Sequence, residues 1–113
     1  MPEKCLFCSI VRGEIPADIV AERDDAIVFR DISPKAPSHL LVIPRRHLDS
    51  LDEADDATDL GNLLQLAAEV ARDEGLFESG YRVVINTNDD GGQTVRHLHL
   101  HILGGRRMTW PPG

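Results

Sequence analysis

Short apolar stretches separated by turn signals predict most of the fold. Over lengths typical of a β-strand, apolar residues alternate with polar ones or run together, and pairs of glycine, proline, asparagine or aspartate separate these stretches. On this pattern we expect strands at residues 19–22, 26–31, 39–44, 81–87 and 95–103, the first two joined as a hairpin. A short helical turn is expected at residues 6–11.

Between residues 50 and 75 the apolar positions recur with the period of a helix. Its inward face is expected to carry Leu60, Leu63, Leu64, Ala67, Val70 and Ala71. Ser50 and Glu53 have the spacing of a capping box, and Gly75 is a natural end. Five strands and one long helix, without regular βαβ alternation, predict an α+β fold. In it, a mostly antiparallel sheet carries the helix on one face.

Composition and charge narrow the class of protein. The 113 residues have the length of a single domain, 1–113, and 42% of them are hydrophobic, which is enough for a core. Twelve Lys and Arg against nineteen Asp and Glu leave a net charge of −7. This charge disfavours nucleic-acid polymers and anionic membranes as partners, but not a small mononucleotide. Since we find no membrane-spanning run and no signal-peptide pattern, we expect a cytoplasmic protein.

Three of the five histidines fall at alternate positions, His97, His99 and His101, with aliphatic residues between them. In a strand this period places the three imidazoles on one face and the aliphatic side chains on the other, against the core. The alternative is a polar strand face that happens to be histidine. His39 and His47, each taken alone, are more typical of surface or hydrogen-bonded core histidines.

Two further motifs flank the histidines. Gly91-Gly92-Gln93-Thr94 ends just before His97, where backbone N–H groups can approach a phosphate, although an ordinary hairpin loop has the same composition. Cys5 and Cys8 form a C-x-x-C pair, which in a reducing compartment indicates a metal or redox pair before a structural disulfide. The redox alternative expects a preceding strand in a βαβ unit, and the few residues before Cys5 are too short for one.

The chain resembles the histidine triad family, whose motif is His-φ-His-φ-His-φ-φ with φ apolar. Residues 97–103 fit this motif at every position. The similarity continues nearly end to end, through residues 7–16, 29–34, 39–44, 91–94, 103–106 and 110–113. The Trp-Pro-Pro-Gly ending resembles the Hint branch, the purine nucleoside phosphoramidate hydrolases.

The resemblance implies a hydrolase with a covalent mechanism. His99 matches the histidine that attacks the α-phosphorus of a nucleoside 5′-phosphoramidate and forms a nucleotidyl-histidine. His39 and His101 would donate hydrogen bonds to the phosphate. Thr94 stands where relatives have a serine that contacts the leaving group. The phosphate site would be completed by Asn86, Gly92 and Gln93.

The resemblance also implies where the nucleoside binds. Asp31 would accept the ribose hydroxyls, and the purine would lie among Phe7, Ile10, Phe29 and Ile32. Without the family match, ordinary core packing is the favoured interpretation of these four apolar residues. A homodimer is expected in the family manner, with Trp110 as an arm that reaches a partner's site; the alternative for Trp110 is a frayed end.

A zinc site is predicted beside the catalytic one. Cys5 and Cys8 supply two thiolates, and His47 and His97 supply two nitrogens, which together make the Cys₂His₂ set of a closed structural zinc site. Some bacterial members of the family carry metal at the corresponding positions, whereas many Hint members lack the cysteines. A three-histidine catalytic zinc at residues 97, 99 and 101 is disfavoured, since one strand rarely brings three imidazoles around one ion.

Two other functions stay open from the sequence. A nucleotide sensor would bind a purine mononucleotide and release it unchanged. A dinucleoside polyphosphate hydrolase would use the same histidine motif, although the Trp-Pro-Pro-Gly ending argues against it.

Overall fold

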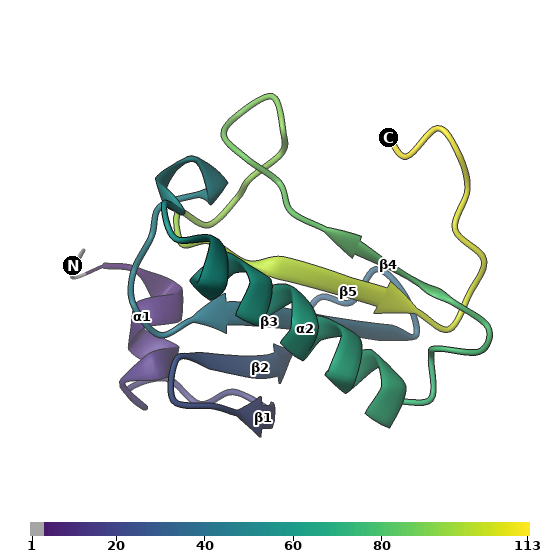
Figure 1. The fold of residues 1–113 in the computed structure, drawn as a ribbon, viewed down its shortest axis with the longest axis horizontal. Coiled ribbons are helices and arrows are strands. Elements are labelled where there is room, and N and C mark those ends of the chain that lie inside the picture. Colours follow the sequence, from purple (N-terminus) through teal and green to yellow (C-terminus); the bar gives the residue numbers. More distant parts are fainter. Residues whose placement is uncertain (1–3) are drawn as a thin grey trace.

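Five strands form one antiparallel sheet, which confirms the predicted fold class. The computed structural model describes residues 4–113. The strands are β1 (Ile19–Glu22), β2 (Ala26–Arg30), β3 (Ser38–Pro44), β4 (Tyr81–Val84) and β5 (Leu100–Gly104), and they lie in the order β1-β2-β3-β5-β4 (Figure 1). All four strand pairs are antiparallel. Strands β3 and β5 therefore lie side by side near the centre of the sheet, with the histidines of both strands on neighbouring positions.

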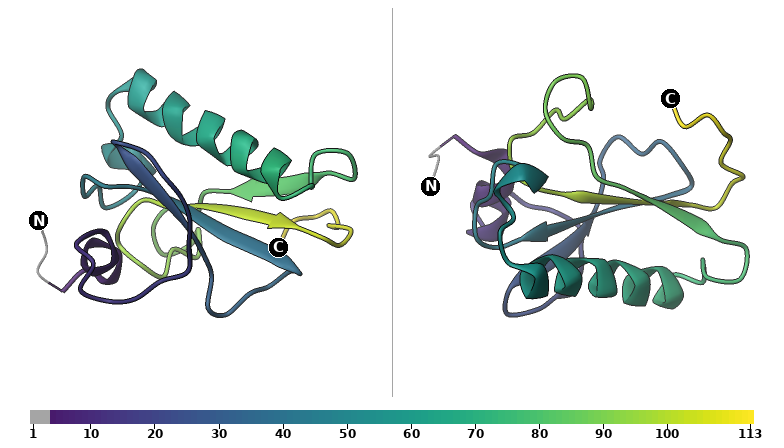
Figure 2. Two further views of the ribbon diagram at one scale, coloured as in Figure 1. Left: turned by 90° about the horizontal axis from the view of Figure 1, so that it is seen from below. Right: turned by 45° about the horizontal axis from the view of Figure 1, so that its top comes forward.

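The two faces of the sheet are covered by helices of different length. Helix α2 (Ala57–Asp73) lies across one face, and helix α1 (Leu6–Val11) lies against the other (Figure 2). Beneath α2 the sheet buries the larger apolar cluster, to which Leu98, Leu100 and Ile102 belong. Beneath α1 a smaller cluster contains Phe7 and Phe29. The side of the sheet with the short helix has room for a site.

Helix α2 begins later than the sequence predicts. Asp56 is its N-cap, and its carboxylate accepts hydrogen bonds from the backbone of Thr58 and Asp59 at 2.8 and 3.3 Å. Ser50 instead caps a separate 3₁₀ turn, η1 (Leu51–Glu53). The predicted capping box is wrong, because the carboxylate of Glu53 accepts from the backbone of Asp49. The backbone is extended at Ala54, and this residue separates the 3₁₀ turn from helix α2.

The inward face of α2 and its end are close to the prediction. Leu63, Ala67, Val70 and Ala71 are buried as expected, whereas Leu64 is 43% exposed and Leu66 is buried in its place. The buried positions follow an i, i+3, i+4 spacing from Leu63, and this spacing turns Leu64 away from the sheet. The helix ends just before Gly75, whose φ of +77° suits a residue without a side chain.

Strands β4 and β5 are shorter than predicted. Their pairing ends where Val84 faces His101, so β4 stops before residues 85–87 and β5 does not include residues 95–99. Beyond this point the backbone N–H of Leu98 donates to Leu48 O, 2.7 Å away, instead of to β4. Residues 85–99 therefore leave the sheet as a loop. Strand β2 also ends one residue earlier, and β3 begins one residue earlier, than expected.

Candidate active site

The histidines of the alternating motif face the side of the sheet that carries α1. His101 belongs to β5, and His97 and His99 occupy the segment directly before it. The rings of His99 and His101 are 4.9 Å apart between centroids, and Phe7 of helix α1 contacts His97 and His99 edge-on at 5.9 and 5.2 Å. The aliphatic residues between them are buried beneath α2. The predicted division into a histidine face and a packing face is confirmed.

A cavity of about 440 Å³ opens on this side of the sheet. Its volume is within the range of small-ligand pockets, about 300–1,000 Å³. Helix α1, strands β2, β3 and β5, and the loop after β4 all contribute to its walls. Among the residues predicted from the sequence, those that line it are Phe7, Ile10, Phe29, Asp31, Ile32, His39, Asn86, Gly92, Thr94, His99 and His101.

His99 is oriented by a backbone carbonyl. Its Nδ1–H donates to the backbone oxygen of His97 at 2.7 Å, and the ring is only 4% exposed. Burial lowers the pKa of His99 below the usual value for histidine. The ring is therefore neutral near pH 7, with the lone pair on Nε2, the nitrogen that the carbonyl does not engage. This is the state that a histidine nucleophile requires.

His39 and His101 form a hydrogen-bonded chain that starts at a backbone amide. The N–H of Lys35 donates to His39 Nδ1 at 3.0 Å, so the proton of the neutral His39 ring is on Nε2. That Nε2–H donates to His101 Nδ1 at 2.9 Å. The proton of His101 is then on its own Nε2. His39 thus orients His101 as a hydrogen-bond donor.

Burial keeps both rings of this chain neutral. It lowers the pKa of His39, against the opposing effect of the Asp31 carboxylate, whose oxygen is 3.5 Å from His39 Nε2. For His101, burial and the neighbouring His99 and His39 lower the pKa to about 4. At neutral pH these hydrogen-bonded histidines therefore present one polarised N–H group to the cavity, the Nε2–H of His101.

The glycine-rich loop reaches the cavity, but not through all of its residues. Gly92 and Thr94 line the cavity, and Gly92 has a φ of +82°. A Cβ on Gly91 would overlap the backbone oxygen of Thr87, so only glycine allows this close passage of the two backbone segments. The loop is held in a tight turn whose shape depends on both glycines.

Gln93 is buried and does not line the cavity. Its amide N–H₂ donates to the backbone oxygens of Asp49 and Val95 at 2.6 and 3.0 Å, and its amide oxygen accepts from the backbone of Asn88 at 2.9 Å. The side chain that the resemblance places in the phosphate site is engaged in holding the loop together.

The apolar part of the cavity has an aromatic wall and an open mouth. Phe7 and Phe29 pack edge to face with their centroids 5.5 Å apart. Ile32 is 97% exposed at the mouth of the cavity. One carboxylate oxygen of Asp31 accepts from the backbone of Ser33 at 2.8 Å, and the other lies towards His39.

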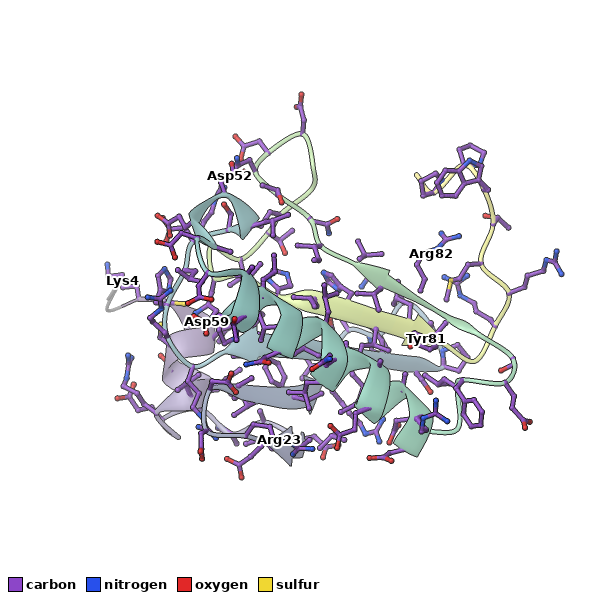
Figure 3. All side chains as sticks on the ribbon, viewed as in Figure 1. Lys4, Arg23, Asp52, Asp59, Tyr81 and Arg82 are labelled. Atoms are coloured by element: carbon purple, nitrogen blue, oxygen red, sulfur yellow. The ribbon has the colours of Figure 1, made fainter. Side chains whose placement is uncertain are left out.

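Trp110 lies outside the cavity of its own chain and is 81% exposed. It belongs to the C-terminal segment, which runs along the edge of the molecule beyond β4 (Figure 1). Arg82 of β4 donates a hydrogen bond to the backbone oxygen of Thr109 at 2.8 Å, and Figure 3 shows Arg82 beside this segment. The structure of one chain does not bring Trp110 to the other predicted site residues.

The four predicted metal ligands form a cluster next to the cavity. Nδ1 of His47 is 3.2 Å from Cys8 Sγ and 3.2 Å from His97 Nδ1, which is 3.4 Å from Cys5 Sγ. Around a tetrahedral zinc with bonds of about 2.0–2.3 Å, neighbouring ligand atoms lie about 3.3–3.8 Å apart. The spacing of the four side chains therefore fits a tetrahedral ion. We call these residues, Cys5, Cys8, His47 and His97, the metal-ligand cluster.

The protonation of the two histidines also suits a metal. Nε2–H of His97 donates to the backbone oxygen of Pro44 at 2.8 Å, and Nε2–H of His47 donates to the carboxylate of Asp49 at 2.6 Å. Both Nδ1 atoms keep their lone pairs and face the sulfurs. Burial, together with the neighbouring Cys5, raises the pKa of Cys8 to about 11, so an ion that binds here displaces a thiol proton.

Asp31, His39 and His101 form a second group of close ligand atoms within the described residues. His39 is unsuited to bind a metal there. Because its Nδ1 accepts from Lys35 N–H, its Nε2 carries the proton and has no lone pair to offer. We assign this group to hydrogen bonding.

A family model described as the HIT domain matches residues 12–108. The chain belongs to the HIT family. An uncharacterised HIT-like protein of Synechococcus elongatus is 53% identical over 115 residues, with full coverage of both chains. A purine nucleoside phosphoramidase of Escherichia coli K12 is 46% identical over 110 residues, which cover 96% of this chain and 92% of that protein.

Solved structures of HIT proteins have the same fold. A HIT family hydrolase from Legionella pneumophila superimposes with a TM-score of 0.94 at 54% identity, over 97% of this chain and all of the other. A zinc-bound histidine triad family protein from Mycobacterium smegmatis gives 0.82 at 32% identity, over 91% of this chain and 76% of the other. Within residues 4–113 of this HIT protein, we find no helix long and apolar enough to cross a membrane.

Several groups that shape the site of this HIT protein are invisible to motif analysis. The backbone oxygens of His97 and Pro44 and the backbone N–H of Lys35 decide three histidine protonation states. A main-chain group carries no sequence signal. The carboxylate of Asp49 is different, because an aspartate two residues after a proposed histidine ligand is a recognisable partner for that ligand.

Proposed function

We propose that this HIT protein hydrolyses the P–N bond of purine nucleoside 5′-phosphoramidates through a covalent intermediate on His99. The observation that carries the proposal is the hydrogen bond from His99 Nδ1 to the backbone oxygen of His97, which leaves the Nε2 lone pair as nucleophile. The name of the Escherichia coli relative, purine nucleoside phosphoramidase, supports the substrate class.

The reaction proceeds in two displacements at phosphorus. First, the lone pair of His99 Nε2 forms a bond to the α-phosphorus while the P–N bond of the substrate breaks. The electron pair of that bond leaves with the amine nitrogen, which takes up a proton from solvent beside Thr94. Water then attacks the phosphorus and loses a proton, and the bond to His99 breaks with return of its electron pair to Nε2. The products are the nucleoside monophosphate and the free amine.

Negative charge on the phosphoryl oxygens is stabilised by groups that are already oriented. The Nε2–H of His101 donates to one oxygen, and the loop around Gly92 and the Asn86 side chain complete the phosphate site. Both nitrogens of His39 are engaged within the protein, so we assign His39 the role of positioning His101. Gln93 acts in the same indirect way by holding the glycine loop.

The nucleoside occupies the apolar part of the cavity. The purine lies against Phe7, Phe29 and Ile10, and it covers the exposed Ile32. Asp31 accepts the ribose hydroxyls, since its carboxylate lies at the wall of the cavity.

We further propose that zinc binds the metal-ligand cluster. The ligand spacing, the two free Nδ1 lone pairs and the zinc-bound relative from Mycobacterium smegmatis support this assignment. A zinc ion closed by four protein ligands stabilises structure and holds no reactive water. The cluster is therefore structural, and the chemistry belongs to His99.

Hydrolysis of adenosine 5′-phosphoramidate by wild type and by His99→Ala, at equal zinc content, tests the proposed function. We expect AMP release by wild type and a loss of at least about a thousandfold in the variant, which keeps its AMP binding. Mass spectrometry of wild type quenched in alkaline denaturant, which preserves a P–N bond to histidine, should show a chain carrying one adenylyl group. Turnover by His99→Ala at the wild-type rate would contradict the covalent mechanism, and AMP binding without turnover in both proteins would favour a nucleotide sensor.

A further inference from the structure

His97 belongs to the metal-ligand cluster and to the active site at the same time. Its ring is fully buried, with Nδ1 3.4 Å from Cys5 Sγ and 3.5 Å from Cys8 Sγ. Its backbone oxygen is the acceptor that orients His99. Any shift of His97 therefore moves the group that decides which nitrogen of His99 is free to react.

Helix α1 connects the cluster to the purine part of the cavity. The sulfurs of Cys5 and Cys8 flank the start of this six-residue helix, and Phe7 lies between them. The Phe7 ring contacts Phe29 on one side and His99 on the other, with centroids 5.5 and 5.2 Å away. An isolated helix of this length is unstable in water, so its position depends on what its side chains bind.

Asp49 connects the cluster to the phosphate loop. Its carboxylate accepts from His47 Nε2 at 2.6 Å, and its backbone oxygen accepts from the buried Gln93 side chain, also at 2.6 Å. Gln93 in turn holds the backbone of Asn88 and Val95. The loop that carries Gly92 and Thr94 is thus tied to the residue that orients a metal ligand.

We propose that zinc at the metal-ligand cluster and a nucleoside monophosphate in the cavity bind with positive cooperativity. The four ligands come from three segments: the start of helix α1, the 47–49 segment and the segment before β5. Phe7 of the first segment and His99 of the third line the cavity. The 47–49 segment acts indirectly, because Asp49 O accepts from Gln93, which holds the loop whose residues Gly92 and Thr94 line the cavity. An ion that joins the three segments orders the walls before the nucleotide arrives, and this lowers the entropic cost of nucleotide binding. The inference rests on the proposed function only in taking a nucleotide as the ligand of the cavity.

Isothermal titration calorimetry with AMP and zinc as the probes tests this cooperativity without reference to catalysis. We expect AMP to bind the zinc-loaded chain about tenfold more tightly than the chelator-stripped chain, within the usual range of about 5- to 150-fold for coupled sites. Because linkage is reciprocal, saturating AMP should raise the affinity for zinc by the same factor. Far-UV circular dichroism should show the same secondary structure in the two forms.

Asp49→Asn provides a variant that acts on the cluster from outside the cavity. Loss of a carboxylate that orients a histidine ligand is expected to weaken zinc binding by about 10- to 100-fold. At limiting zinc the variant should therefore bind AMP more weakly than wild type, and saturating zinc should restore the affinity. Asp55→Asn is the matched control. Asp55 is exposed in the same loop region, its carboxylate forms an ion pair with Arg46 at 4.0 Å, and the change should leave both affinities unchanged.

The outcomes separate this inference from the proposed function. Equal AMP affinity with and without zinc would overturn the cooperativity while leaving the proposed hydrolase intact. Failure of the chain to bind zinc would overturn the inference as well. Loss of the far-UV signal on stripping would also contradict it, because zinc would then hold the whole fold. Absence of AMP binding by the zinc-loaded chain would instead overturn the proposed function.

Discussion

At the scale of single residues, the site is built from neutral histidines whose protons are placed by neighbours. Three histidines each have one ring nitrogen hydrogen-bonded to a backbone group: His97 to Pro44 O, His99 to His97 O, and His39 to the N–H of Lys35. The neutral state follows from burial, which lowers the pKa values of His39, His97, His99 and His101. Below the usual pKa of histidine, the unfolded chain takes up protons that these buried rings do not, and this lowers the free energy of unfolding.

Stability is therefore expected to fall as the pH drops below about 6.5. For His101 the pKa is lowered from 6.5 to about 4, so between these values the unfolded chain binds a proton that the folded chain excludes. This single group withdraws about 3 kcal/mol of stability over that interval. Urea unfolding at a series of pH values measures the slope. His101→Gln should give a shallower slope than wild type, and an identical slope would contradict the assignment.

At the scale of elements, the residue at which helix α2 begins differs from the one that its sequence pattern predicts. The segment from Ser50 to Glu53 forms a 3₁₀ turn, and the helix proper begins only after the cap at Asp56. Figure 3 shows Asp52 high on this turn and Asp59 at the start of the helix. The side chain of Asn88 donates to Asp52 at 3.0 Å, so the turn also supports the loop above the cavity.

Replacing the cap of helix α2 should cost measurable stability. Asp56→Ala removes the acceptor for the backbone N–H groups of Thr58 and Asp59, and caps of this kind contribute about 1 kcal/mol. Thermal or urea unfolding compares it with Asp55→Ala, an exposed neighbour that caps no helix and should change stability by less than about 0.5 kcal/mol. Equal effects of the two changes would contradict Asp56 as the cap.

At the scale of the whole molecule, the sheet formed by the described residues, 4–113, has two edge strands without a further strand beside them, and the C-terminal segment projects from it. Strands β1 and β4 are the outer strands, and the C-terminal segment extends past β4 with Trp110 exposed (Figure 1). Unpaired strand edges and an exposed large aromatic residue are both typical of surfaces that meet a partner. These features support the homodimer that the family resemblance implies.

We expect the chain to sediment as a dimer, with twice the 12.5 kDa mass of one chain. Since Trp110 is the only tryptophan, its fluorescence reports on the C-terminal segment directly. If this segment reaches a partner's cavity, AMP should change the emission of the dimer. Analytical ultracentrifugation over a range of concentrations, combined with an AMP titration, checks both points. A monomer at every concentration would contradict the dimer.

Sequence alone determined the features that depend on local pattern and side-chain type. The period of two in residues 97–103 placed imidazoles and aliphatic side chains on opposite faces, because a strand or extended segment alternates whatever its neighbours are. The C-x-x-C pair and two histidines predicted the metal-ligand cluster by donor type, and the structure brings those four side chains together.

Tertiary structure decided which partner each group meets. Strand β5 begins late because Leu98 bonds to Leu48 and not to β4, and Gln93 points away from the cavity because Asp49 O and Val95 O lie within its reach. The protonation of His99 depends on a backbone oxygen, which every residue possesses. Only the packing of distant segments selects one such group among many, and no pattern of side chains along the chain can encode that choice by itself.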